Sequence, residues 1–268
     1  MPIYKVFGYK EFSKNTSVLY NYGTLAFIIS TIAFYFINTR FNIDYLIIFT
    51  IIANSIAFVF SLLLKEDRDK EASVENIKFN ELRLIYKNKY FLKLVFISSF
   101  FGLSFILINF FYVQILIDNG YNENLISAII LIYSFLQLSQ RIIISILDKR
   151  SIQKNVQLLS LILSIFLIVL FILRSKYIVI AMILFPTFLS VMGIYLERIQ
   201  NNFIDNYKLH EYRATMLSAF NLFSDIFEVI FLVLNSMIAS LNYRYVFFFL
   251  GIMFLISMKI DLKTKSFT

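Results

Sequence analysis

The sequence contains no cysteine, which excludes disulfide scaffolds, thiolate catalysis and metal or iron–sulfur sites with cysteine ligands. It contains one histidine, His210, which lies among charged residues between two apolar runs. A metal site at His210 would need partner ligands that the sequence does not show, so we expect a structural or titrating role. With two prolines, six glycines and 32 phenylalanines, the composition is neither disordered nor fibrous.

Charged residues are scarce, at 16% of the 268 residues, whereas 59% are hydrophobic. A soluble domain is about 25% charged and about 45–50% apolar, and it needs a mostly polar surface. The apolar excess therefore predicts a polytopic membrane protein. The net charge of +8 is then first a signal of topology and only second a hint of nucleic acid.

Eight runs are apolar enough to be transmembrane helices, each of which needs about 20 mostly apolar residues. Most contain no charged residue; the fourth continues past Arg141 to Leu147, the seventh holds two carboxylates, and the eighth is short. We predict an all-α integral membrane protein whose spans lie at Asn15–Thr39, Tyr45–Leu64, Leu94–Ile117, Asn124–Gln140, Asn155–Leu173, Tyr177–Leu196, Ala214–Ser240 and Tyr245–Met258.

Lysine and arginine alternate between the two sides of this topology. If Met1 is cytoplasmic, 21 of the 25 basic residues lie in inside segments and four lie outside. Cytoplasmic loops carry such an excess of positive charge, so we expect both termini to be cytoplasmic. The four outside residues are Arg40, Arg174, Lys176 and Arg244.

One long charged loop, Lys65–Lys93, separates two predicted spans from the six that follow. Part of this loop has roughly helical apolar spacing, which favours an amphipathic segment on the inner leaflet. A solvated linker between two helical bundles is an equally compatible interpretation. In either case the loop is the main boundary in the chain.

Four predicted spans carry polar side chains at helical spacing, and the third carries Asn109 and Gln114. Polar groups in hydrocarbon face the bundle interior or a water-filled cavity, because each polar side chain that faces lipid costs several kcal/mol. We select Asn109, Gln137 and Asn221 as candidates for substrate binding or proton coupling. The four stripes are Thr50, Asn54 and Ser61; Ser134, Gln137, Arg141, Ser145 and Asp148; Thr187, Ser190, Glu197 and Asn201; and Ser218, Asn221, Asp225, Glu228 and Asn235.

Asp225 and Glu228 lie deep in the seventh predicted span. If the helix enters the core near Ala214, a rise of ~1.5 Å per residue puts them roughly 16 and 21 Å deep, near the midplane. A carboxylate at that depth binds a proton or pairs with a cation. One interpretation is a site for proton coupling or a cationic substrate. The other is an internal ion pair with Arg141 or Arg198, or a helix-packing hydrogen bond.

The entry to the seventh predicted span reads EYRATMLS from Glu211 to Ser218. This resembles the E-[YH]-R-A-T-x-L-S element between helices 10 and 11 of bacterial major facilitator superfamily transporters. Upstream, Ile204-Asp205-Asn206 is similar to the end of helix 10 in that family, although Leu209 replaces its usual proline. The segment LDKR from Leu147 to Arg150 is similar to the family's loop between helices 8 and 9.

This resemblance implies two six-helix bundles with substrate bound between them near the midplane. The eight spans would be helices 5–12, and helices 1–4 are expected to be missing. Residues 1–64 would then hold the last two helices of the first bundle, 65–93 the loop between bundles, and 94–268 a complete second bundle. The resemblance gives Arg213 a role as a cytoplasmic gate cation, with plain topology as the alternative. The other motif residues assigned to this gate are Glu211, Thr215, Asp148 and Arg141.

The expected function is that of a truncated or split secondary transporter for an unidentified small molecule, proton-coupled when complete. Without helices 1–4 the chain lacks one wall of the central site, so we do not expect it to transport alone. The alternative is a non-transporting membrane subunit that needs a partner. An enzyme is not expected, because a single histidine and no cysteine leave little for acid–base or nucleophilic catalysis.

The expected partners are the lipid bilayer of the plasma or inner membrane, a small-molecule substrate, and a polypeptide that supplies helices 1–4. We expect no cofactor and no metal. Nucleic acid is not an expected partner, because the basic residues are dispersed over alternate loops and form no continuous patch. The sequence does not indicate the substrate, the direction of transport or the coupling ion.

Overall fold

The computed structural model describes residues 12–40, 43–63, 88–207, 209 and 212–260, which form helices and no strand. The all-α prediction is therefore confirmed for these residues. Each predicted run matches a helix to within a few residues at most boundaries, but the sixth is longer and the fourth is divided in two. The helices are α2 (Phe12–Arg40), α3 (Ile43–Leu63), α5 (Lys89–Asp118), α6 (Glu123–Gln137), α7 (Gln140–Leu147), α8 (Ile152–Ile172), α9 (Ile178–Asn206), α10 (Arg213–Leu241) and α11 (Arg244–Met258).

Four helices, α5, α8, α9 and α10, are long and apolar enough to cross a membrane. A fifth span is formed if α6 and α7, which meet at a bend of 40°, are counted together. Two shorter apolar helices are α11 and the stretch Ile47–Val59 of α3. These helices support a multi-pass membrane protein, while eight spans and the missing helices 1–4 stay predictions.

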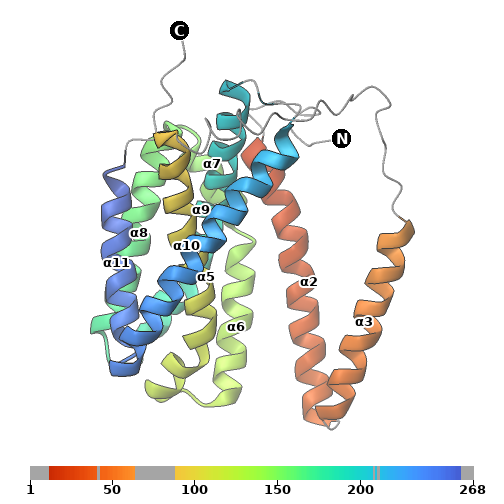
Figure 1. The fold of residues 1–268 in the computed structure, drawn as a ribbon. Coiled ribbons are helices and arrows are strands. Elements are labelled where there is room, and N and C mark those ends of the chain that lie inside the picture. Colours follow the sequence, from red (N-terminus) through yellow and green to blue (C-terminus); the bar gives the residue numbers. More distant parts are fainter. Residues whose placement is uncertain (1–11, 41–42, 64–87, 208, 210–211, 261–268) are drawn as a thin grey trace.

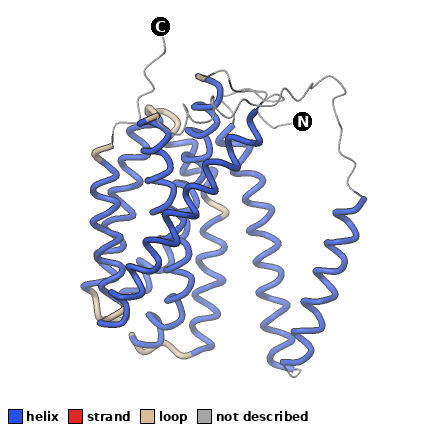
Figure 2. The backbone as a smooth tube through the Cα atoms, viewed as in Figure 1, coloured by secondary structure: helices blue, strands red, loops and turns tan. Residues whose placement is uncertain are grey.

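Helices α5 to α11 form one bundle, and α2 lies along its side (Figure 1). Helix α9 is central, because it contacts α2, α5, α6, α7, α8 and α10. Helix α2 packs on α6, α7 and α9, whereas α3 contacts α2 and leans away from the bundle (Figures 1 and 2). In the described residues, the two sides of the long charged loop therefore meet mainly between α2 and the bundle.

The helices run alternately up and down, with α6 and α7 acting as one passage (Figure 1). The first residue of α2 and the last residue of α11 consequently lie at the same end of the bundle. This arrangement agrees with an even number of passages. Two predicted features, the amphipathic stretch of the Lys65–Lys93 loop and the environment of His210, lie outside the described residues.

Asparagine side chains cap the N-termini of α5 and α6. Asn88 accepts a hydrogen bond from the backbone N–H of Tyr90 at 2.8 Å, and Asn122 accepts one from Leu125 at 2.9 Å. Such caps satisfy N–H groups that have no partner inside the helix. Between the two helices the chain turns at Gly120, whose φ of +83° suits glycine because it has no Cβ.

At the same end of the bundle as this turn, Asp118 closes α5 and contacts the turn between α10 and α11. Its Oδ2 accepts a hydrogen bond from the Tyr243 hydroxyl at 2.5 Å. Arg244 donates to the backbone oxygen of Leu173 at 2.9 Å, which ties the same turn to α8. Burial, and next the hydrogen bond with Asp118, raise the pKa of the Tyr243 hydroxyl above its ordinary value. These bonds hold three helix ends together.

Small residues allow α8 and α11 to pack closely. The Ser164 hydroxyl donates to the backbone oxygen of Gly251 at 2.7 Å, and Ser257 donates to Ser160 at 3.3 Å. A Cβ at Gly251 would lie 3.0 Å from Cγ1 of Ile168. Serine and a single glycine thus provide the close approach that membrane helices usually obtain from small residues.

Replacing Gly251 by valine is expected to lower the free energy of unfolding by about 2 kcal/mol, because the branched side chain overpacks the α8–α11 interface. The measurement is thermal unfolding of the purified protein in detergent. Gly23→Val is the matched control, since a Cβ at Gly23 meets nothing within 4 Å. Equal unfolding temperatures for the two variants would contradict the close packing of α8 on α11.

Candidate functional site

Two adjoining cavities lie between α2 and the helices α5, α6 and α9. Their volumes are about 530 and 350 Å³, and both are in the size range of small-molecule sites. Four residues, one from each of the four helices, line both cavities. They are Phe27, Phe105, Gln137 and Pro186.

Two of the candidates selected from the sequence, Gln137 and Asn109, line this cavity pair. Hydroxyl groups of Tyr20, Thr24, Tyr133 and Ser190 complete its polar lining. The rest of the wall is largely aromatic or aliphatic, so a few polar groups converge on an apolar space. That is the composition expected of a binding site for a small molecule.

A polar chain reaches from α2 into the break between α6 and α7. Asn21 donates to the backbone oxygen of Leu138 at 3.3 Å and accepts from the Gln140 amide at 2.6 Å. The Gln140 side-chain oxygen accepts in turn from the Ser190 hydroxyl of α9 at 2.7 Å. These bonds satisfy a carbonyl freed by the helix break, which hydrocarbon alone would leave unpaired.

Gln140 is fully buried, and sequence reasoning did not select it. Gln140→Leu is expected to lower the free energy of unfolding by about 1–2 kcal/mol, because Asn21 and Ser190 lose their shared partner. The measurement is thermal unfolding, with Gln114→Leu as the control, since Gln114 is exposed and bonds only within α5 to Asp118. A Gln140→Leu variant as stable as the control variant would contradict a structural role for this chain of bonds.

A second contact between α2 and α9 lies next to the cavity. The Tyr20 hydroxyl donates to Oε1 of Glu197 at 2.5 Å, and Tyr20 itself lines the larger cavity. The adjacent cation, Arg198, is directed instead to Asp148 at 3.0 Å, and Tyr195 donates to the same Asp148 oxygen at 2.9 Å. The polar stripe predicted for this span therefore faces the interior, as expected.

The motif residues assigned to the gate fall into two groups at one end of the bundle. Arg213 is 8% exposed and donates hydrogen bonds to Asn201 and Asp205, which joins the start of α10 to the end of α9. Asp148 joins the end of α7 to α9 through Arg198 and Tyr195. Two further gate candidates, Thr215 and Arg141, are exposed, and Glu211 lies outside the described residues.

The polar residues of the α10 stripe differ in how far they are exposed. Asn221 and Asp225 are exposed, and Glu228 is half-buried against α5, where a Cβ on Gly102 would overlap its carboxylate. Among the described residues, Arg198 forms its ion pair with Asp148, and none is recorded between these α10 carboxylates and Arg198. Only 17% of the apolar stretch of α10 is buried. Asn221 and Asp225 do not face the interior of the bundle that the described residues form, because α10 packs on α5 through its other face. The water-filled cavity that the sequence also allows for them stays a prediction.

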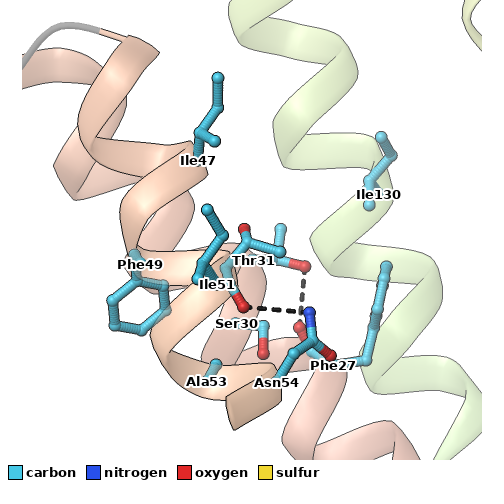
Figure 3. Close-up of a pocket in the computed structure, with 10 residues that line it drawn as sticks. Phe27, Ser30, Thr31, Ile47, Phe49, Ile51, Ala53, Asn54 and Ile130 are labelled. Atoms are coloured by element: carbon cyan, nitrogen blue, oxygen red, sulfur yellow. Dashed lines mark hydrogen bonds between the residues drawn. The ribbon is translucent and has the colours of Figure 1, made fainter.

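A larger groove of about 790 Å³ lies between α2, α3 and α6, from which Ile130 lines it (Figure 3). Its polar side chains bond within their own helices: Thr31 donates to the backbone oxygen of Phe27 at 2.8 Å, and Asn54 to that of Thr50 at 3.0 Å. Among the described residues, no cluster of histidine, aspartate and glutamate could hold a metal ion.

Comparison with known families gives one finding. The sequence model of the Major Facilitator Superfamily matches residues 3–227 of the chain. No curated protein and no solved structure matches. The family match covers α2, α3 and most of the bundle, including every helix that lines the cavity pair.

Proposed function

The chain belongs to the Major Facilitator Superfamily, a family of membrane transporters rather than enzymes, and we propose that it binds and carries a small solute in the cavity pair between α2, α5, α6 and α9. The observation that carries the proposal is the position of this cavity. It lies between a helix that precedes the long charged loop and three helices that follow it, with Gln137 and Asn109 in its wall.

Alternating access moves one helical bundle against the other around a central site. In our proposal α2 and α3 are helices 5 and 6, and α5 to α11 form the six helices of the second bundle. Four further helices, on the same or another polypeptide, would complete the first bundle. The chain by itself is then not expected to transport, and uptake or efflux by this chain alone would contradict this part of the proposal.

We further propose that Asp225 and Glu228 couple transport to protons, with Asn221 beside them. Two carboxylates one helical turn apart repel when both are charged, which favours a shared proton. The fit of the Glu228 carboxylate against Gly102 supports this role, because proton binding at that place would alter the α5–α10 contact. Replacement of Glu228 by glutamine should abolish the pH dependence of transport by the complete carrier.

Arg213 is proposed as the gate residue, because its guanidinium joins the ends of α9 and α10 at one end of the bundle. Thr215, Glu211, Asp148 and Arg141 belong to the same proposed gate. We place this end, and both termini, on the cytoplasmic side of the plasma or inner membrane, on the basis of the distribution of lysine and arginine.

Ligand-induced stabilisation tests the binding part of the proposal. A solute that binds the folded chain at 100 times its Kd raises the free energy of unfolding by about 2.7 kcal/mol. We expect a screen of small solutes to contain one that raises the unfolding temperature of the wild type but not of Gln137→Leu or Asn109→Leu. A solute that stabilises all three proteins equally would bind elsewhere and would contradict the proposed site.

A second candidate function is that of a membrane subunit that does not transport. The exposed side chains of Asp225, Asn221 and Ser218 on α10 favour this alternative, since polar groups facing lipid are costly and another protein could cover them. A membrane protein that copurifies with the chain in fixed stoichiometry, without solute transport by the complex, would support it. Transport by that complex would support the carrier proposal instead.

A further inference from the structure

We propose that the cavity pair accepts an apolar, aromatic organic cation, with Glu197 supplying the negative charge that the ligand neutralises. This inference rests on the proposed solute site and adds the chemical class of the solute. Three features support it: the aromatic walls of the cavities, the charges around them and the position of the Glu197 carboxylate.

Phenylalanine rings form much of the wall. Phe27 and Phe105 line both cavities, while Phe101 lines one and Phe185 the other. The side chains of Phe27 and Phe105 are 45% and 54% exposed, so their ring faces are available to a ligand. Aromatic faces attract cations and also bury apolar surface. A ligand that is both aromatic and positively charged makes use of both properties.

None of the residues described as lining the two cavities is lysine or arginine. Their polar members are hydroxyl and amide groups, among them Thr24, Asn109, Gln137 and Ser190. An anion that enters this cavity loses its hydration shell and meets no positively charged side chain in the described lining. Desolvation of the anion is therefore costly. The lining therefore disfavours anionic solutes.

Glu197 lies directly beyond one end of the cavity. Pro186, Ser190 and Gly193 of α9 line the cavity, and Glu197 follows them at the next helical spacing on the same face. Its Oε1 accepts the hydrogen bond from Tyr20, a residue of the cavity wall. The carboxylate is thus separated from the cavity by the Tyr20 hydroxyl.

The charge of Glu197 has no cation beside it in the described part of the chain. The ion pairs there are Arg198–Asp148 and Arg213–Asp205, and neither includes Glu197. A neutral hydroxyl satisfies one oxygen of a carboxylate without neutralising it. A cation in the cavity next to Tyr20 would neutralise the Glu197 carboxylate. The attraction between the two charges is stronger there than in bulk water, since water is partly excluded.

Two probes of the same shape and opposite charge test this inference. Binding of tetraphenylphosphonium and of tetraphenylborate is measured by equilibrium dialysis with the full chain in phosphatidylcholine nanodiscs, and binding to protein-free nanodiscs is subtracted. We expect saturable binding of tetraphenylphosphonium, with a Kd at least about tenfold lower than that of tetraphenylborate. Phe105→Ala should weaken the binding of the cation.

The Glu197→Gln variant should bind tetraphenylphosphonium about tenfold more weakly, and Glu197→Asp should restore most of the affinity. Asp118→Asn is the charge-matched control; Asp118 is the last residue of α5, where it binds Tyr243 and does not line either cavity, so this change should leave the Kd within about twofold. If Glu197→Gln does not fold, the preference of the wild type for the cation over the anion decides the question.

Three outcomes would overturn the inference: no saturable binding of tetraphenylphosphonium, equal or tighter binding of tetraphenylborate, or an equal loss of affinity in Glu197→Gln and Asp118→Asn. The uncharged probe triphenylmethanol separates this failure from failure of the solute site. If triphenylmethanol binds saturably, loses affinity in Gln137→Leu and binds as tightly as the cation, the solute class is wrong while the proposed site stands.

Discussion

Replacing Arg213 by alanine is expected to lower the free energy of unfolding by about 3–5 kcal/mol, the largest effect of any single change considered. The guanidinium is 8% exposed and donates to Asn201 and Asp205, so its removal leaves the Asp205 carboxylate in a buried place without the charge of Arg213. The expected result is a large drop in the unfolding temperature in detergent, together with separation of the α9 and α10 ends.

Two further variants show whether the loss comes from this pair. Arg150→Ala removes an exposed arginine in the turn after α7 and should change stability by less than about 0.5 kcal/mol. The double variant Arg213→Met and Asp205→Leu removes both charges and should regain most of the loss. If the double variant is as unstable as Arg213→Ala, the buried pair does not explain the effect.

Replacing Gly102 by leucine is expected to expel Glu228 from the α5–α10 interface and to lower the free energy of unfolding by about 1 kcal/mol, because the flexible end of the glutamate side chain can move away. A Cβ at this position already overlaps the Glu228 carboxylate, and the remaining leucine atoms add to the overlap. Thermal unfolding measures the loss of stability. The exposure of position 228 is measured by the reaction of a thiol reagent with a cysteine placed there, in chains with Gly102 and with Leu at position 102. The natural chain has no cysteine that would react.

The double variant Gly102→Leu and Glu228→Ala separates overlap with Glu228 from a general effect on α5. It should recover at least half of the lost stability, because the smaller side chain at position 228 makes room for the leucine. Loss of the same size in the single and the double variant would mean that Glu228 does not pack against Gly102.

Most helix positions could be predicted from the sequence, because a charge-free run of membrane length has few alternatives to a helix in hydrocarbon. The division of the fourth run into α6 and α7 could not. The run has no proline or glycine at the break, whereas Pro186 lies inside the continuous helix α9. The break depends on tertiary hydrogen bonds from Asn21 and Gln140, which no local pattern reveals.

The candidate site was only partly predictable for a similar reason. Asn109 and Gln137 were found because an amide in an apolar run needs a polar environment. Tyr20 was missed because tyrosine is common in membrane helices and does not stand out there. Glu197 was recognised as part of a stripe but not selected, because the sequence does not show that it lies beside Tyr20 of another helix.

Helical spacing predicted that Asn221 and Asp225 share a face of the helix, but it does not show what that face contacts. In the structure, the apolar side of α10, with Met216 and Phe220 fully buried, packs on the bundle. The polar side is left exposed.

The central claim is that a solute cavity open to water lies between α2 and the bundle. Because the chain has no cysteine, single cysteines can be placed at Thr24, Gln137 and Ser190 in the cavity, and at Ile165 and Val233 on outward faces of α8 and α10. Labelling with a membrane-impermeant maleimide, in membranes opened from both sides, then measures contact with water. The account predicts that the three cavity positions react and that the two outward positions, which face lipid, do not. Protection of all three cavity positions, or equal reaction at all five, would contradict it.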